Sequence, residues 1–242
     1  MTRKLFYKSL WLLVLCWAFN NTALAMGIRS LVALPVEKDG AVVRLALNHD
    51  QQADSTTLIT SAAYGINARQ TLLMALPYRL SPAGKDRQGD ASVLYRHIVW
   101  QQDYFQGTDR LGLLAGVLIP GQDNSDTALQ GGLVFSRFIN RHEIDLDALY
   151  RTGMGERADT GRFDISWQYR LFPRQHADWG IGEEFYSVVE LNGRWHQENG
   201  MTRQMTLGVQ WVKAAWVVEG AMIKNITNSQ QDQYLLSTRF HF

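Results

Sequence analysis

Short segments of alternating apolar and polar residues follow one another along most of this chain. In residues 163–171, for example, Ile165 and Trp167 fall on one side of an extended strand, whereas Asp164 and Gln168 fall on the other. Side chains alternate between the two faces of a β-strand, so this pattern predicts strands with one apolar and one polar face. Twelve strands are predicted, at 41–49, 56–64, 70–80, 91–101, 109–119, 128–139, 142–152, 162–171, 184–196, 203–212, 214–224 and 232–242. No stretch with helical periodicity competes with them, and the sequence therefore predicts an all-β fold.

The first 25 residues have the three parts of a secretory signal peptide. A basic start is followed by the apolar stretch 9–19 and by the small-residue sequence Ala-Leu-Ala at 23–25. The apolar stretch is shorter than the roughly 18–20 residues that span a bilayer, which argues against the alternative of an uncleaved anchor helix. We expect cleavage after Ala25. Cys16 would then be removed, and the mature chain would have no disulfide, thiolate metal site or cysteine nucleophile.

The charge of the chain excludes one class of partner. Lys and Arg number 24 against 23 Asp and Glu, and residues 1–25 hold three of the basic residues and no acidic one, so the mature charge is −2. A nearly neutral exported protein has no electrostatic basis for binding nucleic acid. After residue 25, no apolar run approaches the roughly 18–20 residues of a membrane helix. Hydropathy alone is thus compatible with a soluble, secreted β-sandwich, the main alternative to a membrane barrel.

Strand length and connection length favour the membrane barrel. The predicted strands have about 9–12 residues, as tilted strands crossing a hydrocarbon layer do, whereas strands in soluble proteins average about five or six. The connections alternate between long polar loops and tight turns, which is the arrangement of outer-membrane barrels. The long loops are 49–55, 81–90, 120–127, 152–160 and 225–232, and the tight turns include 65–69, 140–142 and 212–214.

Aromatic residues give the third indication, because they fall near the strand ends on the apolar face. On the tight-turn side they are Tyr64, Phe138, Tyr169, Trp211, Trp216, Phe240 and Phe242. On the long-loop side they are Tyr78, Tyr150, Phe163, Trp195 and Tyr234. Amphipathic rings settle at the two interfaces of a membrane, and a soluble sandwich has no reason to sort them in this way. Lipid offers no partner to an unpaired backbone group, so the sequence predicts a closed, up-and-down, antiparallel transmembrane β-barrel of about 12 strands.

The last predicted strand ends the chain on a phenylalanine. Its outward positions Tyr234, Leu236, Phe240 and Phe242 resemble the C-terminal assembly signal of outer-membrane barrels, which implies the barrel-assembly machinery as a partner. The prediction divides the chain into a signal peptide (1–25), a periplasmic N-terminal lead-in (26–40) and an outer-membrane barrel (41–242). The barrel is expected to be a monomer surrounded by the lipid of the cell outer membrane.

Charged residues on the polar strand faces are predicted to point into the barrel, because an Arg or Lys facing lipid at mid-membrane costs about 2–4 kcal/mol. The predicted lumen lining is Glu143, Asp145, Asp147, Arg151, Asp164, Gln168, Arg170, Glu190, Asn192, Arg194, His196 and Arg239. Two roles are open for these side chains. They can line a polar pore whose charges select solutes, or they can form an ion-pair network that plugs a narrow barrel.

No catalytic or metal site can be assembled from the sequence. The six histidines have no zinc-binding spacing, and the His-x-Ser pair of an outer-membrane phospholipase is absent. Asp145 and Asp147 share a strand face at a spacing that suits paired carboxylates or calcium binding, but such residues more often fill a wet lumen. The sequence therefore predicts neither an enzyme nor a cofactor.

Several short pieces carry a resemblance to a known family. They are Gly89-Asp90 before the sequence at 92–96, the strand–Pro–Gly step at 116–121, the Tyr-Arg-Leu strand ends at 78–80 and 169–171, and the Phe-terminated last strand. Together they resemble the outer-membrane barrel family named for the MetA pathway of phenol degradation. This resemblance implies a barrel that passes small organic molecules, and it supplies no binding or catalytic residues. We therefore expect a passive channel or transporter for small organic or polar solutes with a charged lumen. The alternative is a non-conducting barrel that serves envelope integrity.

Overall fold

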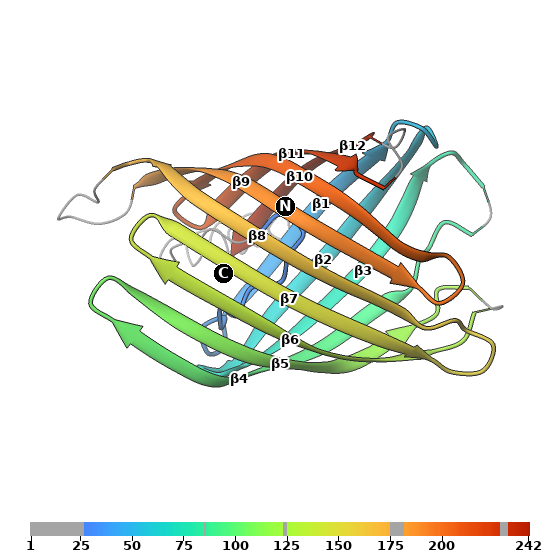
Figure 1. The fold of residues 1–242 in the computed structure, drawn as a ribbon, viewed down its shortest axis with the longest axis horizontal. Helices are drawn as coiled ribbons and strands as arrows, with labels where there is room; N and C mark the ends of the chain where they lie inside the picture. Colours follow the sequence, from blue (N-terminus) through green and yellow to red (C-terminus); the bar gives the residue numbers. More distant parts are fainter. Residues whose placement is uncertain (1–26, 85, 123–124, 175–181, 228–231) are drawn as a thin grey trace, which may run out of the picture.

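A computed structural model describes residues 27–84, 86–122, 125–174, 182–227 and 232–242 of the chain. The signal peptide predicted for residues 1–25 lies outside these ranges. The regular structure consists of strands (Figure 1). They are β1 (Ala41–Asp50), β2 (Ser55–Asn67), β3 (Gln70–Ser81), β4 (Ala91–Tyr104), β5 (Gly107–Ile119), β6 (Ala128–Ile139), β7 (His142–Gly153), β8 (Thr160–Phe172), β9 (Glu183–His196), β10 (Gly200–Lys213), β11 (Trp216–Asn225) and β12 (Asp232–His241). Nowhere in the described part of the chain is a helix long and apolar enough to cross a membrane.

The strands form a closed barrel in which each strand pairs with its neighbours in sequence and β12 pairs with β1. At this seam Val43 lies opposite Phe240, and Leu47 lies opposite Leu236. Antiparallel pairing therefore runs around the whole cylinder and closes it. The predicted twelve-stranded, up-and-down antiparallel barrel is confirmed.

Most strands extend further than their alternation predicts. β2 ends at Asn67, whereas the sequence predicts a strand over 56–64 and a turn that begins at Gly65. A Cβ atom on Gly65 would lie 1.9 Å from the backbone oxygen of Glu37. Glycine is thus required there because another stretch of backbone passes close to β2, not because the chain turns.

The apolar faces of the strands point away from the barrel axis. Leu133, Leu207 and Leu236 are about half exposed, at 51%, 48% and 58%, whereas Asp145 and Asn192 are fully buried. This distribution is the reverse of that in a soluble protein, where charged groups face water and large apolar groups are covered. The β-sandwich alternative is therefore wrong.

The inner wall formed by β4, β5 and β6 carries an apolar cluster. Leu94, Ile98, Leu114 and Val134 are buried there and pack around Ala33 of the chain that precedes β1. Where this cluster lies, both faces of these strands are apolar. This is the physical reason why residues 91–139 show so little alternation in the sequence.

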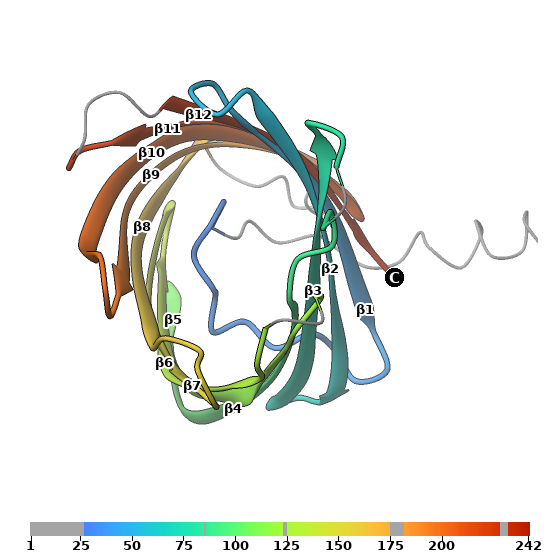
Figure 2. The same ribbon diagram turned by 90° about the vertical axis from the view of Figure 1, so that its right-hand side faces the viewer.

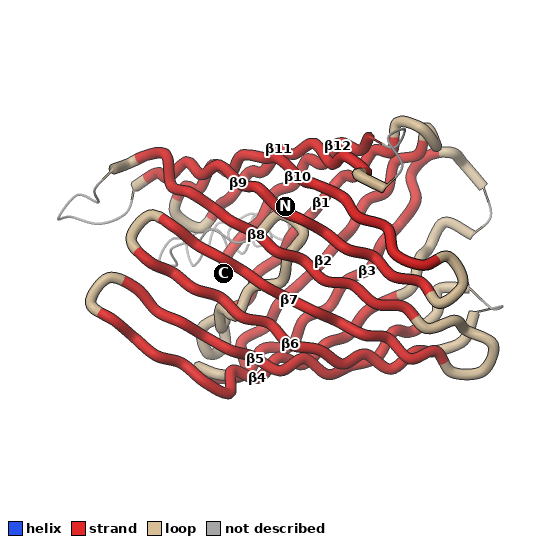
Figure 3. Tube along the Cα trace, viewed as in Figure 1, coloured by secondary structure: helices blue, strands red, loops and turns tan. Residues whose placement is uncertain are grey.

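The two ends of the barrel differ in their connections, as Figure 3 shows. At one end, two-residue turns join β2 to β3, β4 to β5, β6 to β7 and β10 to β11. Longer loops lie at the opposite end, as predicted. Two connections depart from this pattern in length: ten residues separate the ends of β8 and β9 at the tight-turn end, and three residues separate β9 from β10 at the loop end.

Strands β3 and β4 pair over only part of their length. Their ladder ends where Ala75 lies opposite Ser92, two residues before Pro77. Proline has no N–H to donate, and beyond it the loop after β3 supplies the pairing: Gly89 donates its backbone N–H to the carbonyl of Pro77 at 2.9 Å. The pairing partner of β3 thus changes at Pro77, from β4 to the loop that follows β3.

Aromatic side chains gather on the outer surface near the tight-turn end. Phe185, Trp211, Trp216 and Phe240 form a continuous row across β9 to β12, with ring centroids 5.6–6.5 Å apart. At the loop end, Tyr150 stacks on Trp195 at 6.0 Å. The rings thus occupy the two heights at which interfacial belts are expected.

A charge on the outer surface is expected to destabilise the barrel in a depth-dependent way. Leu207 lies near the middle of β10, so Leu207→Arg should cost about 2–4 kcal/mol in a bilayer. Met201 lies near the end of the same strand, and Met201→Arg should cost about 0–1 kcal/mol. Urea unfolding of the two variants in lipid vesicles measures the difference. Equal costs would contradict a membrane-spanning orientation of β10.

Candidate functional site

The chain that precedes β1 runs inside the barrel. Figure 2, which looks into the cylinder, shows it (blue) within the ring of strands. We call residues 27–36 the N-terminal segment. The sequence predicts residues 26–40 to be a periplasmic lead-in. The structure differs: Ile28, Val32 and Ala33 are buried, at 1%, 2% and 0% exposure, among inward-facing side chains of the wall.

Inward-facing carboxylates and hydroxyls accept the backbone N–H groups of the segment. Both oxygens of Glu190 lie 3.1 Å from the amide nitrogen of Arg29. Oδ2 of Asp147 accepts from Leu31 at 2.7 Å. These bonds satisfy backbone N–H groups that could not otherwise be buried without cost.

The wall also binds the segment further along and through its carbonyl groups. Oγ of Ser136 accepts the N–H of Ala33 at 2.8 Å. Arg96, which is 2% exposed, donates to the carbonyl oxygens of Val32 and Leu34. The wall therefore satisfies both donors and acceptors, much as a neighbouring strand would.

One side chain of the segment anchors it by packing. Ile28 lies in a buried cluster with Val188, Ile223 and Leu235. A Cβ atom on Gly208 of β10 would lie 2.3 Å from Cδ1 of Ile28. The glycine therefore provides the space that this isoleucine occupies.

An ion-pair network lies on the β1, β11 and β12 side of the lumen. Glu219 is fully buried and accepts from Arg44 at 2.7 Å, from Arg239 and from the hydroxyl of Ser237. Arg44 also donates to the carbonyl of Ile28 at 2.7 Å. The network thus connects the barrel seam to the N-terminal segment.

A second polar network covers the inner faces of β7, β8 and β9. Asp164 accepts from Arg194 at 2.6 Å and from Asn192 at 2.7 Å. Asp145 accepts from Ser136 at 2.5 Å and from Gln168 at 2.9 Å. Asp145 and Asp147 therefore have separate partners and do not act as a carboxylate pair.

The structure places the predicted lumen residues as follows. Buried inside the barrel are Glu143, Asp145, Asp147, Asp164, Gln168, Glu190, Asn192 and Arg239. Half-buried are Arg151, Arg170, Arg194 and His196. Arg170 lies away from the cavities described below and pairs with Glu184 at 3.0 Å. The outward positions proposed as an assembly signal, Tyr234, Leu236, Phe240 and Phe242, are 38–58% exposed.

Sequence analysis did not identify five further charged residues that line the cavities or belong to the ion-pair network. They are Arg29, Arg44, Arg96, Arg162 and Glu219. The alternation of side chains along a strand could have identified three of them. Arg44, Arg162 and Glu219 each lie two residues from a position that is buried or was already predicted to face the lumen. Arg96 lies in a strand with two apolar faces, and Arg29 precedes the barrel, so neither had such a signal.

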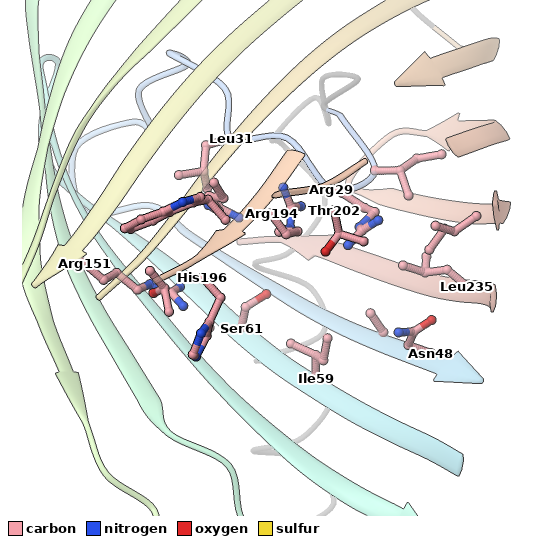
Figure 4. Close-up of a pocket in the computed structure, with 18 of the residues that line it drawn as sticks. Arg29, Leu31, Asn48, Ile59, Ser61, Arg151, Arg194, His196, Thr202 and Leu235 are labelled. Carbon is pink, nitrogen blue, oxygen red and sulfur yellow. The ribbon is translucent and has the colours of Figure 1, made fainter. Parts of the chain in front are cut away.

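Two cavities adjoin the N-terminal segment. The larger has a volume of about 650 Å³ and extends from Ile28 to Asn199 in the β9–β10 turn, so it reaches the loop end of the barrel (Figure 4). Arg29, Arg44, Arg151, Arg162 and Arg194 line it, and the described residues of its lining include no Asp or Glu. The smaller cavity, of about 250 Å³, extends to Arg96 and Arg239. No cluster of His, Cys, Asp and Glu suitable for a metal ion occurs among the described residues.

The barrel has the architecture of solved outer-membrane proteins. A KdgM porin aligns with a TM-score of 0.55 at 9% identity, over 83% of this chain and 99% of the porin. The COG4313 outer membrane channel from Pseudomonas putida F1 aligns with a TM-score of 0.55 at 13% identity, over 91% of this chain and 100% of the channel. The chain has the fold of outer-membrane barrels.

A KdgM porin in complex with disordered oligogalacturonate has the same outer-membrane barrel fold, with a TM-score of 0.52 at 10% identity, over 83% of this chain and 99% of the porin. No family model matches the sequence, and no curated protein matches it. The resemblance to the MetA-pathway family is therefore supported at the level of an outer-membrane barrel fold, and the pathway itself stays a prediction.

Proposed function

We propose that this protein is a passive outer-membrane channel for small organic or polar solutes, narrowed by its own N-terminal segment. The observation that carries the proposal is the pair of cavities beside that segment, about 650 and 250 Å³, inside a closed barrel. The two cavities share Leu31, Arg44, Arg151 and Arg162 in their linings, so they adjoin one another around the segment. The proposal includes export to the outer membrane, a monomeric state and assembly through the C-terminal strand. It includes no catalytic step.

The alternative function is that of a non-conducting structural barrel. The extent of the polar networks favours it, because fully buried groups such as Glu219 and Asp164 are engaged in ion pairs and occupy space that a solute would need. A barrel of this size lies between eight strands, which side chains fill, and sixteen, which leave an aqueous channel. Conductance therefore decides between the two functions.

Liposome swelling and planar-bilayer recordings on the refolded mature protein test the proposal. A channel admits small sugars and amino acids into liposomes and gives discrete conductance steps. A structural barrel gives neither, although it still resists heat and urea. A barrel that folds by these criteria but never conducts, in the presence or absence of the N-terminal segment, would overturn the proposal.

The open channel is expected to prefer anions. Five arginines line the larger cavity, and a ring of one charge concentrates counter-ions. Arg151→Glu should shift the reversal potential in a salt gradient toward cation selectivity. Arg151 forms no ion pair among the described residues, so the change breaks none. Arg69→Glu, in the exposed β2–β3 turn, makes the same change of charge outside the cavity and should leave the reversal potential nearly unchanged.

A further inference from the structure

Three arginines form an inward-facing row on adjacent strands at the loop end of the lumen. Arg162 of β8 lies directly opposite Arg194 of β9. Arg151 of β7 lies opposite Thr160, two residues from Arg162 on the same face of β8. Like charges in such cross-strand positions destabilise a sheet unless something compensates them. Figure 4 shows Arg29 of the N-terminal segment directed toward the same cavity as Arg151 and Arg194.

Two arginines of this row, and Arg29 beside it, have hydrogen-bond donors without an acceptor among the described residues. Arg151 donates only through Nε, to Oε1 of Gln130 at 3.0 Å. Arg162 makes no hydrogen bond; its guanidinium lies 3.4 Å from Asp147 and 3.7 Å from Asp164, and its buried Nε has no partner. Arg29 donates to Gln204 at 2.7 Å and to Asn192 at 3.4 Å, both neutral amides. These guanidinium groups therefore have capacity for further acceptors.

The carboxylates nearest the row accept hydrogen bonds from other groups, while Oδ1 of Asp147 and Oδ2 of Asp164 face Arg162 as ion-pair partners without a hydrogen bond. Asp164 holds Arg194 at 2.6 Å, Asp147 accepts the N–H of Leu31 at 2.7 Å, and Glu190 accepts those of Arg29 and Ser30. None of these three acidic residues lines the larger cavity. The surface that a solute meets there is cationic, although acidic groups lie behind it.

We propose that the larger cavity is a binding site for a small organic polyanion, a di- or tricarboxylate, whose carboxylates accept from Arg29, Arg151 and Arg162. Guanidinium groups bind carboxylates through two parallel N–H donors, and such charge-assisted bonds are about twice as strong as neutral ones. The cavity volume of about 650 Å³ is in the range of small-molecule sites. Several arginines on different strands favour several anionic groups over one. The inference rests on the proposed channel in one respect: it names the class of solute that the channel would carry.

Calorimetric titration of citrate into the refolded mature protein in neutral detergent tests the site without measuring transport. We expect one citrate per barrel, with affinity that falls as salt is added. Arg151→Gln and Arg162→Gln should each weaken binding by about tenfold or more, since each removes a charged donor. Arg69→Gln, in the exposed β2–β3 turn, is the matched control and should bind as the unmodified protein does.

Acetate, inorganic phosphate and glucose complete the test. Acetate and glucose should bind at least about tenfold more weakly than citrate, because acetate carries a single charge and glucose carries none. Citrate binding that is absent, or equal in Arg151→Gln, Arg162→Gln and Arg69→Gln, would overturn the site. Phosphate binding as tight as citrate would also overturn it, since any compact oxyanion would then suffice. If the barrel binds citrate but never conducts, the binding site is supported and the channel proposal is wrong. If it conducts but does not bind citrate, the channel is supported and the binding site is wrong.

Discussion

Deletion of residues 27–36 is expected to raise the single-channel conductance several-fold while the barrel remains folded. The segment lines both cavities, so its removal should widen the space that they share. Glu190, Asp147 and Ser136 would lose protein donors but would face the water that enters. The deletion begins after Met26, so the predicted signal-peptide cleavage site stays intact. Planar-bilayer recordings measure the change, and heat-dependent electrophoretic mobility checks folding.

A reversible lock of the segment provides the control for this deletion. The amide nitrogen of Ala33 lies 2.8 Å from Oγ of Ser136, so cysteines at these two positions are close enough to test for a disulfide. After signal cleavage they would be the only cysteines in the chain. The oxidised Ala33→Cys/Ser136→Cys protein should conduct less than its reduced form. A deletion variant with unchanged conductance, together with a lock that has no effect, would show that the segment does not limit flow.

Glu219→Gln is expected to destabilise the folded barrel by about 3–5 kcal/mol. Glu219 is fully buried and balances Arg44 and Arg239, both of which donate to it. Removal of the negative charge leaves two neighbouring guanidinium groups in a poorly hydrated place, and their mutual repulsion adds to the cost. Urea unfolding in detergent or vesicles measures the loss.

Glu183→Gln is the matched control, because it makes the same chemical change at the surface. Glu183 pairs with Lys213 at 2.7 Å, but their side chains are 41% and 52% exposed. Exposed pairs of this kind contribute about 0–1 kcal/mol. If Glu219→Gln lowers the free energy of unfolding no more than Glu183→Gln does, the ion-pair network around Glu219 is hydrated and contributes little to stability.

The strands between residues 142 and 196 could be predicted with their faces. One face of these strands is on the apolar exterior and the other faces a polar network. The residue type therefore indicates the face directly: Ile165 points outward and Asp164 points inward. Arg44, Arg162 and Glu219 could have been placed by the same parity. Strands β4 to β6 could not be oriented, because their inner face carries an apolar cluster that packs against Ala33.

The position of the N-terminal segment had no comparable signal. Its course is set mainly by bonds from the wall to its backbone, such as those of Glu190 and Asp147 to the amides of Arg29 and Leu31. Backbone groups are the same in every residue, so they leave no pattern in the sequence. Gly208 makes room for Ile28, but a glycine in a strand does not reveal which distant residue needs the space.

The wall binds the backbone of the N-terminal segment more than its side chains. The attachment of the segment and the permeability of the barrel can therefore vary independently. Arg96 donates to two carbonyl oxygens of the segment, and Ser136 accepts from one of its N–H groups. These bonds do not depend on which side chains the segment carries. Substitutions at half-buried positions of the segment, such as Arg29 and Leu31, can therefore change which molecules pass without removing these backbone bonds.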